Sequence, residues 1–157
     1  MDNIVSWNMR GMNGPNKQKG VKAFCIRNKA GLVCMMVTKV QRCNFTKVAS
    51  SFQEWEHSVN YEEHDRGRVW IMWKAAEFKV MVIESMEQAI HCEILHIFTN
   101  RCFALTTIYG SNDANERLLL WQFLINKSTS TLPWLIVGDF NHLLYADDRI
   151  GGAPVTL

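Results

Sequence analysis

The sequence lacks a long apolar run. Its longest apolar stretches, residues 32–37 and 132–137, have the length of a strand, whereas a helix that crosses a bilayer needs about 20 apolar residues. The N-terminus also places Asp2 where a signal peptide has a basic residue, and no apolar core follows it. We therefore expect an intracellular protein, nuclear or cytoplasmic, that has no membrane partner.

Paired cysteines are also missing. The five cysteines are an odd number, and no two of them form a Cys-x-x-Cys pair. Cys25, Cys34 and Cys43 recur every nine residues, a spacing that no zinc site requires. We expect reduced thiols that serve mostly as small apolar side chains, and no disulfide framework.

A strong net charge is absent as well, because 17 basic and 15 acidic residues leave only +2. The charge is unevenly distributed, however. Residues 1–50 hold nine Lys or Arg and one acidic residue, whereas residues 51–157 hold eight basic and fourteen acidic residues. Such an asymmetry is typical of a surface that faces phosphates. A solvated basic helix over residues 17–29, beside acidic loops, explains it equally well.

Large apolar side chains are abundant: the chain has six Trp, eight Phe and eight Met. With 157 residues, it is long enough to bury them in the core of one domain. We expect a single domain over residues 1–157.

The order of the apolar segments predicts an α/β fold. Residues 4–7 and 32–37 have the pattern of strands around an amphipathic helix at about 16–29, and Gly31 is expected to stop that helix. A helix around 45–53 follows. The remaining expected elements are strands at 55–61, 68–73, 78–85, 89–95, 103–109 and 134–137, and a helix that Asp113 caps and that ends near Lys127.

The strongest local motif is Val-Gly-Asp-Phe-Asn at 137–141, the end of an apolar strand. A buried strand with this ending delivers a carboxylate and an amide to the rim of a sheet. There Asp139 could orient or deprotonate a water, and Asn141 could hold a phosphoryl oxygen. Taken alone, the motif is better explained by an ordinary Asx turn after a strand.

Three further segments place polar residues at the ends of predicted strands. Asn8 lies in Ser-Trp-Asn-Met-Arg-Gly-Met at 6–12, Val-Thr-Lys at 37–39 closes the second strand, and Tyr109 lies in Ile-Tyr-Gly-Ser-Asn at 108–112. In order and spacing, the series resembles the endonuclease/exonuclease/phosphatase family, and especially the endonuclease domain of plant non-LTR retrotransposons. Other segments similar to that subgroup are 67–73, 88–92, 117–121 and 148–152.

The resemblance implies a four-layered α/β sandwich, with two β-sheets flanked by helices, and Mg²⁺-dependent hydrolysis of a phosphodiester in nucleic acid. By that resemblance, Asn8 lies beside the metal and the scissile phosphate, and Tyr109 hydrogen-bonds a phosphate oxygen. Asp139 aligns the attacking water and helps to hold the metal, while Asn141 stabilises the developing charge.

Two departures from the family pattern predict little activity. Family members have a metal-binding Glu two positions before the Lys of the second strand, and here that position is Val37, which offers no oxygen to Mg²⁺. The family also ends with a Ser-Asp-His-like motif, which does not appear in the sixteen residues after Asn141. His91 matches a family position that is structural.

The early C-terminus predicts a sandwich that is incomplete there, with an exposed apolar sheet face that invites self-association or a protein partner. These patterns favour a divergent, inactive fragment of a Mg²⁺-dependent DNA endonuclease domain of retrotransposon origin. The alternatives are a weakly active metal-dependent endonuclease and a non-catalytic module that binds nucleic acid or protein.

Overall fold

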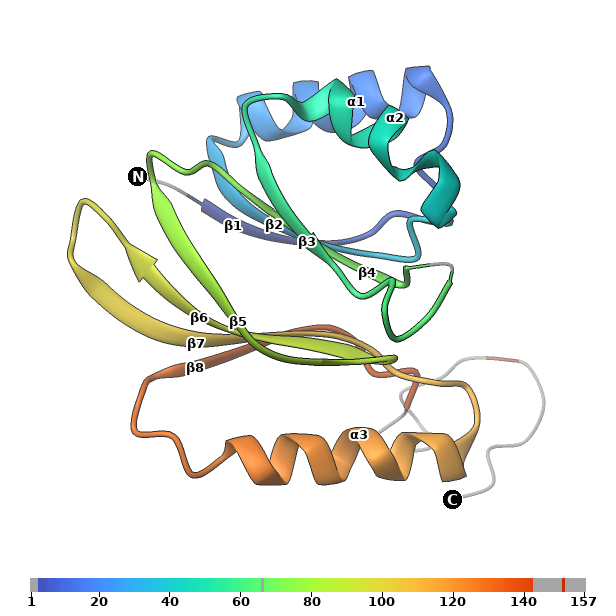
Figure 1. The fold of residues 1–157 in the computed structure, drawn as a ribbon, viewed down its shortest axis with the longest axis vertical. Coiled ribbons are helices and arrows are strands. Elements are labelled where there is room, and N and C mark those ends of the chain that lie inside the picture. Colours follow the sequence, from blue (N-terminus) through green and yellow to red (C-terminus); the bar gives the residue numbers. More distant parts are fainter. Residues whose placement is uncertain (1–2, 66, 143–150, 152–157) are drawn as a thin grey trace.

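The computed structural model describes residues 3–65, 67–142 and 151. Two four-stranded β-sheets lie one upon the other, and helices cover the outer face of each (Figure 1). The layers follow the order helix, sheet, sheet, helix, which confirms the predicted α/β sandwich of two β-sheets flanked by helices. Most of the family-like segment at 148–152 lies outside the described residues.

The first sheet has the strand order β1-β2-β4-β3. β1 (Asn3–Asn8) runs parallel to β2 (Ala30–Met36), β2 is antiparallel to β4 (Val69–Trp73), and β4 is antiparallel to β3 (Glu56–Val59). Every residue of β2 and β4 is buried, because helices cover one face of the sheet and the second sheet covers the other. This double covering explains why both strands are continuous apolar runs.

The second sheet has the strand order β5-β6-β7-β8. β5 (Phe78–Met86), β6 (Ala89–His96) and β7 (Arg101–Tyr109) form an antiparallel meander, and β8 (Trp134–Asp139) is parallel to β7. Both sheets therefore mix parallel and antiparallel pairs. In each sheet the parallel pair includes an edge strand, β1 in the first and β8 in the second.

Helices cover both outer faces (Figure 1). α1 (Pro15–Arg27) and α2 (Phe45–Ala49) lie on the first sheet, and two 3₁₀ turns, η1 (Arg42–Asn44) and η2 (Ser50–Phe52), flank α2. α3 (Ala114–Lys127) lies on the second sheet. Among the described residues, no helix combines the length and the apolar character that a membrane crossing demands.

One expectation about helix ends is wrong, because Gly31 does not stop α1. The helix ends at Arg27, Asn28 caps it, and Lys29 adopts a left-handed φ of 48°, the conformation that a glycine commonly supplies after a helix. Gly31 already belongs to β2. Asp113, by contrast, caps α3 as expected, since its carboxylate accepts hydrogen bonds from the backbone N–H groups of the first helical turn at 2.8 and 3.0 Å.

Three of the five cysteines lie in the apolar interior. Cys25 is buried between α1 and the first sheet, while Cys34 and Cys92 belong to the core between the two sheets. Burial raises the pKa of both Cys34 and Cys92 to about 12, so these thiols stay protonated and act as small apolar side chains, as expected. Cys43 and Cys102 are exposed and free.

Candidate functional site

Four strands end at the same end of the sandwich and carry the predicted site residues there. In the first sheet β1 and β2 are parallel, and Asn8 pairs with Met36, the residue before Val37. In the second sheet β7 and β8 are parallel, and Tyr109 pairs with Asp139. Because parallel strands end at the same edge of a sheet, each sheet contributes two of these residues to one rim.

A hydrogen bond joins the two sheets at this rim. Asn8 Nδ2 donates to Asp139 Oδ2 at 3.2 Å, and the Asn141 backbone N–H donates to Asp139 Oδ1 at 2.9 Å. The Asn141 side chain donates to the carbonyl oxygen of Gly110 at 2.6 Å. The Asx turn and the candidate site are thus one structure, in which the turn after β8 holds the Asp139 carboxylate toward Asn8.

Gly138 sets the position of Asp139. Its φ is 138°, and a Cβ added there would lie 2.0 Å from the carbonyl oxygen of Ile108. No side chain fits in that space, so the glycine lets β8 approach β7 closely immediately before the carboxylate.

The amide of Asn8 has one unsatisfied atom. Its Oδ1 is buried and has no hydrogen-bond partner among the described residues. A buried acceptor left in this way costs about 1–3 kcal/mol. The oxygen is therefore suited to a cation or to a hydrogen-bond donor of a ligand.

Val37, the residue after β2, adopts a strained backbone conformation beside the Asn8–Asp139 pair. Its φ is 56°, a left-handed value at which a β-branched residue is an outlier and which costs about 1–3 kcal/mol. Two backbone hydrogen bonds hold it there, from its N–H to the Arg68 carbonyl (3.0 Å) and from the Gly11 N–H to its own carbonyl (2.9 Å). Its half-buried isopropyl group faces the cleft described below and supplies no oxygen.

These donors do not fit a tight Mg²⁺ site. Mg²⁺ takes oxygen ligands at about 2.0–2.1 Å in near-ideal octahedra and is usually held by one or two carboxylates together with substrate phosphates and water. Here the rim offers one carboxylate, Asp139, and one amide oxygen, Asn8 Oδ1. No three His, Cys, Asp or Glu side chains among the described residues gather closely enough to hold a metal ion. An ion would depend mainly on its own water.

A cleft of about 590 Å³ opens at the same strand ends; we call it the strand-end cleft. Sequence reasoning gave no role to two of its residues. His64 comes from the loop between β3 and β4, where no motif marks it, and Arg68 lies in the family-like segment 67–73, for which no function was predicted. The residues that line the cleft are Val37, Lys39, Gln41, His64, Arg68, Tyr109, Gly110, Ser111 and Asn112.

The wall of the strand-end cleft is held by Glu87 and Asn60. Glu87 Oε1 lies 3.6 Å from His64 Nε2 and 3.3 Å from Arg68 Nη2. Asn60, which is 1% exposed, donates to the carbonyl oxygens of Met86 and Glu87 and accepts from the Val69 N–H. The loop is therefore fixed in place, and Glu87 offsets part of the charge of Arg68.

The lining of the strand-end cleft contains two permanent cations and no carboxylate, although Glu87 pairs with Arg68 and Glu116 accepts a hydrogen bond from the lining residue Ser111. Lys39 is exposed and forms no ion pair with a described residue, and Arg68 adds a second permanent cation. The hydroxyl of the half-buried Tyr109 supplies a hydrogen-bond donor beside them. Two cations and a phenol are groups that commonly bind phosphate oxygens.

His91 lies away from the strand-end cleft. It is 4% exposed beneath α3, where its ring contacts Phe123 and Trp134. Its Nδ1 lies 2.7 Å from Thr106 Oγ1. Burial lowers the pKa of His91, and nearby Lys127 lowers it further. A neutral, enclosed imidazole fits the structural position that the resemblance gave it.

No protein-family model matches the chain, and no curated protein matches it. Solved structures do match. Humanized D. rerio TDP2 shares 15% identity at a TM-score of 0.66, over 90% of this chain and 66% of that one. An endonuclease/exonuclease/phosphatase family protein from Bacteroides thetaiotaomicron shares 11% identity at a TM-score of 0.62, over 88% and 62%.

The endonuclease domain of TRAS1, a telomere-specific non-LTR retrotransposon, also matches. It shares 12% identity at a TM-score of 0.64, over 87% of this chain and 58% of that domain. This chain therefore spans about two thirds or less of each of these structures. At such low identity, the matches establish the architecture: the chain has the fold of the endonuclease/exonuclease/phosphatase proteins.

Proposed function

We propose that the chain is a divergent part of a metal-dependent phosphodiesterase domain of the retrotransposon endonuclease type, and that it does not cleave nucleic acid. Val37 is the observation that carries the proposal, because an isopropyl group stands where an anionic donor would complete the Asn8–Asp139 pair. The likeness in fold to an endonuclease domain supports the class of ancestor.

Electrostatics supports the loss of activity. The rim holds one formal negative charge, at Asp139, while Lys39 and Arg68 line the adjoining cleft. Positive side chains repel a divalent cation and attract a phosphodiester. The strand-end cleft thus retains groups suited to binding a phosphate but lacks the anionic ligands that would activate it through Mg²⁺.

A nicking assay on supercoiled DNA tests this proposal. We expect wild type in Mg²⁺ or Mn²⁺ to leave the DNA as intact as buffer does, and Asp139→Ala to behave identically. Efficient nicking by wild type that disappears in Asp139→Ala would show that the site is active.

A weakly active endonuclease is the alternative that the unpartnered Asn8 Oδ1 supports, since that atom and the Asp139 carboxylate could hold a hydrated ion together. This alternative requires saturable Mg²⁺ binding in the millimolar range by calorimetry. The binding must disappear in Asp139→Ala and weaken in Asn8→Ala. If titration of wild type with Mg²⁺ releases or absorbs no heat beyond that of dilution, this alternative is eliminated.

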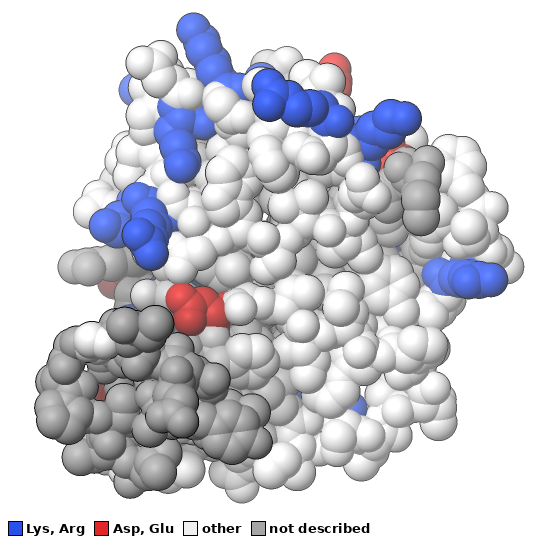
Figure 2. All heavy atoms as spheres, turned by 180° about the vertical axis from the view of Figure 1, so that it is seen from behind, with Lys and Arg blue, Asp and Glu red and all other residues white. Residues whose placement is uncertain are grey.

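A non-catalytic role in nucleic-acid binding is supported by the outer layer of the first sheet. Five exposed basic residues on and just after α1 form what we call the α1 basic face. In the described part of the chain, none of the five forms an ion pair with a carboxylate. Figure 2 shows Lys and Arg gathered over this layer. The α1 basic face consists of Lys17, Lys19, Lys22, Arg27 and Lys29.

Salt-dependent anisotropy with a labelled single-stranded DNA tests this role, because phosphate contacts make affinity fall steeply with salt. We expect Lys17→Glu/Lys19→Glu to weaken binding and to reduce the salt slope. Lys79→Glu, at an exposed lysine on β5, is the control for a charge reversal outside this face and should leave both unchanged. Affinity that is independent of salt, or equal losses in both variants, would refute the role.

Self-association is supported by the open edges of β1 and β8, each of which pairs on one side only within the described residues. Between them lies an apolar groove, and Leu135 on β8 is 38% exposed. Sedimentation should show dimers that Leu135→Asp disrupts and that Leu118→Asp, on the outer side of α3, preserves. A monomer at every concentration excludes this proposal. The groove is lined by Ile4, Phe103, Pro133, Trp134 and Leu135.

A further inference from the structure

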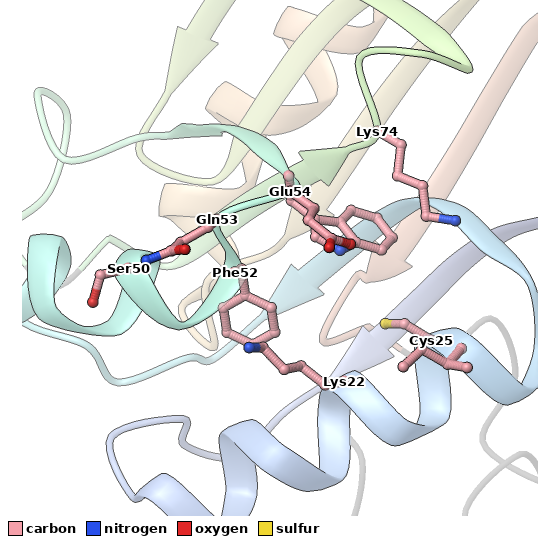
Figure 3. Close-up of a pocket in the computed structure, with 9 residues that line it drawn as sticks. Lys22, Cys25, Ser50, Phe52, Gln53, Glu54 and Lys74 are labelled. Carbon is pink, nitrogen blue, oxygen red and sulfur yellow. The ribbon is translucent and has the colours of Figure 1, made fainter.

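A second cleft, which we call the helix-side cleft, lies on the outer face of the first sheet (Figure 3). Its volume is about 530 Å³, within the range of about 300–1,000 Å³ for small-molecule sites. Lys74 places it at the end opposite to Asn8, since the Lys74 N–H donates to the Gly31 carbonyl at 2.9 Å, where β2 begins. The strand-end cleft, by contrast, lies where β2 ends.

Two lysines in the helix-side cleft are held over aromatic rings. Lys22 Nζ lies 5.6 Å from the ring centroid of Phe52, and Lys74 Nζ lies 5.5 Å from that of Trp55. Both distances are within the range of a cation–π contact, which extends to about 6 Å. In Figure 3 the Lys22 side chain reaches from α1 to the Phe52 ring, while Lys74 approaches from the opposite wall. The ammonium groups are therefore positioned, and their remaining N–H bonds can reach an anion.

The floor and rim of the helix-side cleft are apolar. Phe52 is 2% exposed and Trp55 is half-buried. Cys25 contributes a buried thiol, and burial raises the pKa of Cys25 although Lys74 opposes the change. That thiol is therefore neutral. Ile26 stands at the rim with 79% of its surface exposed, more than any other large apolar side chain described in the first sheet and its helices.

The lining of the helix-side cleft carries a net positive charge. Lys22 belongs to the α1 basic face and forms no ion pair with a described carboxylate. Lys74 lies 3.1 Å from Glu77 Oε1, which neutralises part of its charge. Glu54 is the single carboxylate in the lining, and its side chain is exposed to water, which screens its charge.

We propose that the helix-side cleft binds a small organic anion that has a flat apolar body and one anionic head group. The ammonium group of Lys22, which has no carboxylate partner among the described residues, binds the head group, while Phe52, Trp55 and Ile26 contact the body. Ser50 and Gln53 place neutral hydrogen-bonding groups at the end of the cleft away from Lys74 (Figure 3). This binding is independent of the function proposed for the strand-end cleft.

The charged and apolar residues of the lining together restrict the class of ligand that the cleft can bind. A bare phosphate would leave the aromatic and aliphatic walls without a partner, and a neutral aromatic compound would leave the Lys22 ammonium group without an anionic partner. Two kinds of molecule share the required chemistry, namely aromatic acids and mononucleotides. In a mononucleotide, the base supplies the flat body and the phosphate supplies the head group.

Fluorescence titration with anilinonaphthalene sulfonate, a flat apolar body with one sulfonate, tests the proposal on the whole chain. We expect one saturable site. Lys22→Gln/Lys74→Gln should weaken the probe about tenfold, the scale of a charge-assisted hydrogen bond. Glu54→Gln should tighten binding about twofold, because it removes the opposing charge. Lys19→Gln/Lys47→Gln, which removes two charges at exposed positions outside the cleft, should leave the dissociation constant unchanged.

Two comparisons complete the test. Neutral N-phenylnaphthylamine should bind all variants equally, and thermal melting should show that each variant is folded. Competition then separates the sources, since displacement by adenosine 5′-monophosphate identifies a nucleotide site and displacement by naphthoate alone identifies an aromatic-acid site. The proposal is overturned if neither competes, if Lys19→Gln/Lys47→Gln weakens probe binding as much as Lys22→Gln/Lys74→Gln does, or if Glu54→Gln weakens it.

Discussion

The strand-end cleft and the helix-side cleft have similar volumes, about 590 and 530 Å³, but they are built in opposite ways. At the strand ends, hydrogen bonds and unusual backbone angles fix the polar groups, and the rim retains only one anionic donor. On the helix side, long lysine side chains supply charge, and aromatic rings hold them. The difference teaches what the proposed function requires, namely that the fold keeps the geometry of the strand ends although Val37 supplies no charge to the site.

The largest expected effect is a loss of overall stability, which would disrupt both clefts together. Trp70 in β4 is fully buried and contacts Phe45 and Tyr61 beneath α2. Trp70→Ala should reduce the free energy of unfolding by about 3–5 kcal/mol, as measured by urea denaturation. Phe98→Ala, whose side chain is 73% exposed, is the control and should change it by less than about 0.5 kcal/mol. A Trp70→Ala protein of wild-type stability would contradict the packing described for the first sheet.

A change at Asn60 should disturb the strand-end cleft and spare the helix-side cleft. Asn60→Ala leaves the Val69 N–H and two carbonyl groups without their partner, and each buried group left unpaired costs about 1–3 kcal/mol. Thermal melting should show the loss, and hydrogen exchange should increase in residues 60–68. Asn126→Ala, at an exposed position on α3, is the control. Equal protection of residues 60–68 in both variants would show that Asn60 does not hold the loop.

Relief of the strain at Val37 should stabilise the protein. Asn tolerates the left-handed region far better than a β-branched residue does, so Val37→Asn should raise the free energy of unfolding by about 1 kcal/mol. Val82→Asn, at a partly exposed valine whose φ is negative, should be neutral or destabilising. Destabilisation at position 37 as well would mean that the apolar contacts of Val37 outweigh its backbone strain.

The smallest effect concerns acid stability, away from both clefts. Because burial lowers the pKa of His91 below its ordinary value of 6.5, the folded protein binds protons less readily than the unfolded chain does. The stabilising contribution is complete above that ordinary pKa and declines as the pH falls below it. His91→Gln should therefore lose less stability than wild type between about pH 7 and pH 5. His142→Gln, at an exposed position, should follow wild type, and an unchanged acid loss in His91→Gln would exclude this cause.

Much of the fold could be predicted from the sequence because its signals are local. β2 and β4 are continuous apolar runs, Asp113 stands where a helix cap belongs, and polar residues mark the ends of β1, β7 and β8. The end of α1 could not be placed correctly, since Lys29 takes the left-handed angle without help from a glycine. No sequence pattern indicates that this lysine adopts a left-handed backbone conformation.

The candidate site was predictable only in part, for the same reason. Asn8 and Val37 share one sheet edge, and Tyr109 and Asp139 share another, as expected of parallel strands; only the family resemblance predicted that the two edges meet. His64 and Arg68 reach the strand-end cleft because Asn60 and Glu87 fix a loop across the two sheets. The helix-side cleft depends on lysine–aromatic contacts between residues far apart in the sequence, which no local pattern reveals.

Thermal melting of wild type and Val37→Glu at increasing Mg²⁺ concentrations tests most directly whether the site lacks activity because it lacks a carboxylate. We expect no shift in wild type at millimolar Mg²⁺. Mg²⁺ at ten times its dissociation constant should stabilise Val37→Glu by about 1.4 kcal/mol. For a chain of this size, each kcal/mol raises the melting temperature by about 2–4 °C. Adding Asp139→Ala should abolish this gain. A saturable Mg²⁺ shift in wild type that Asp139→Ala removes would contradict the claim.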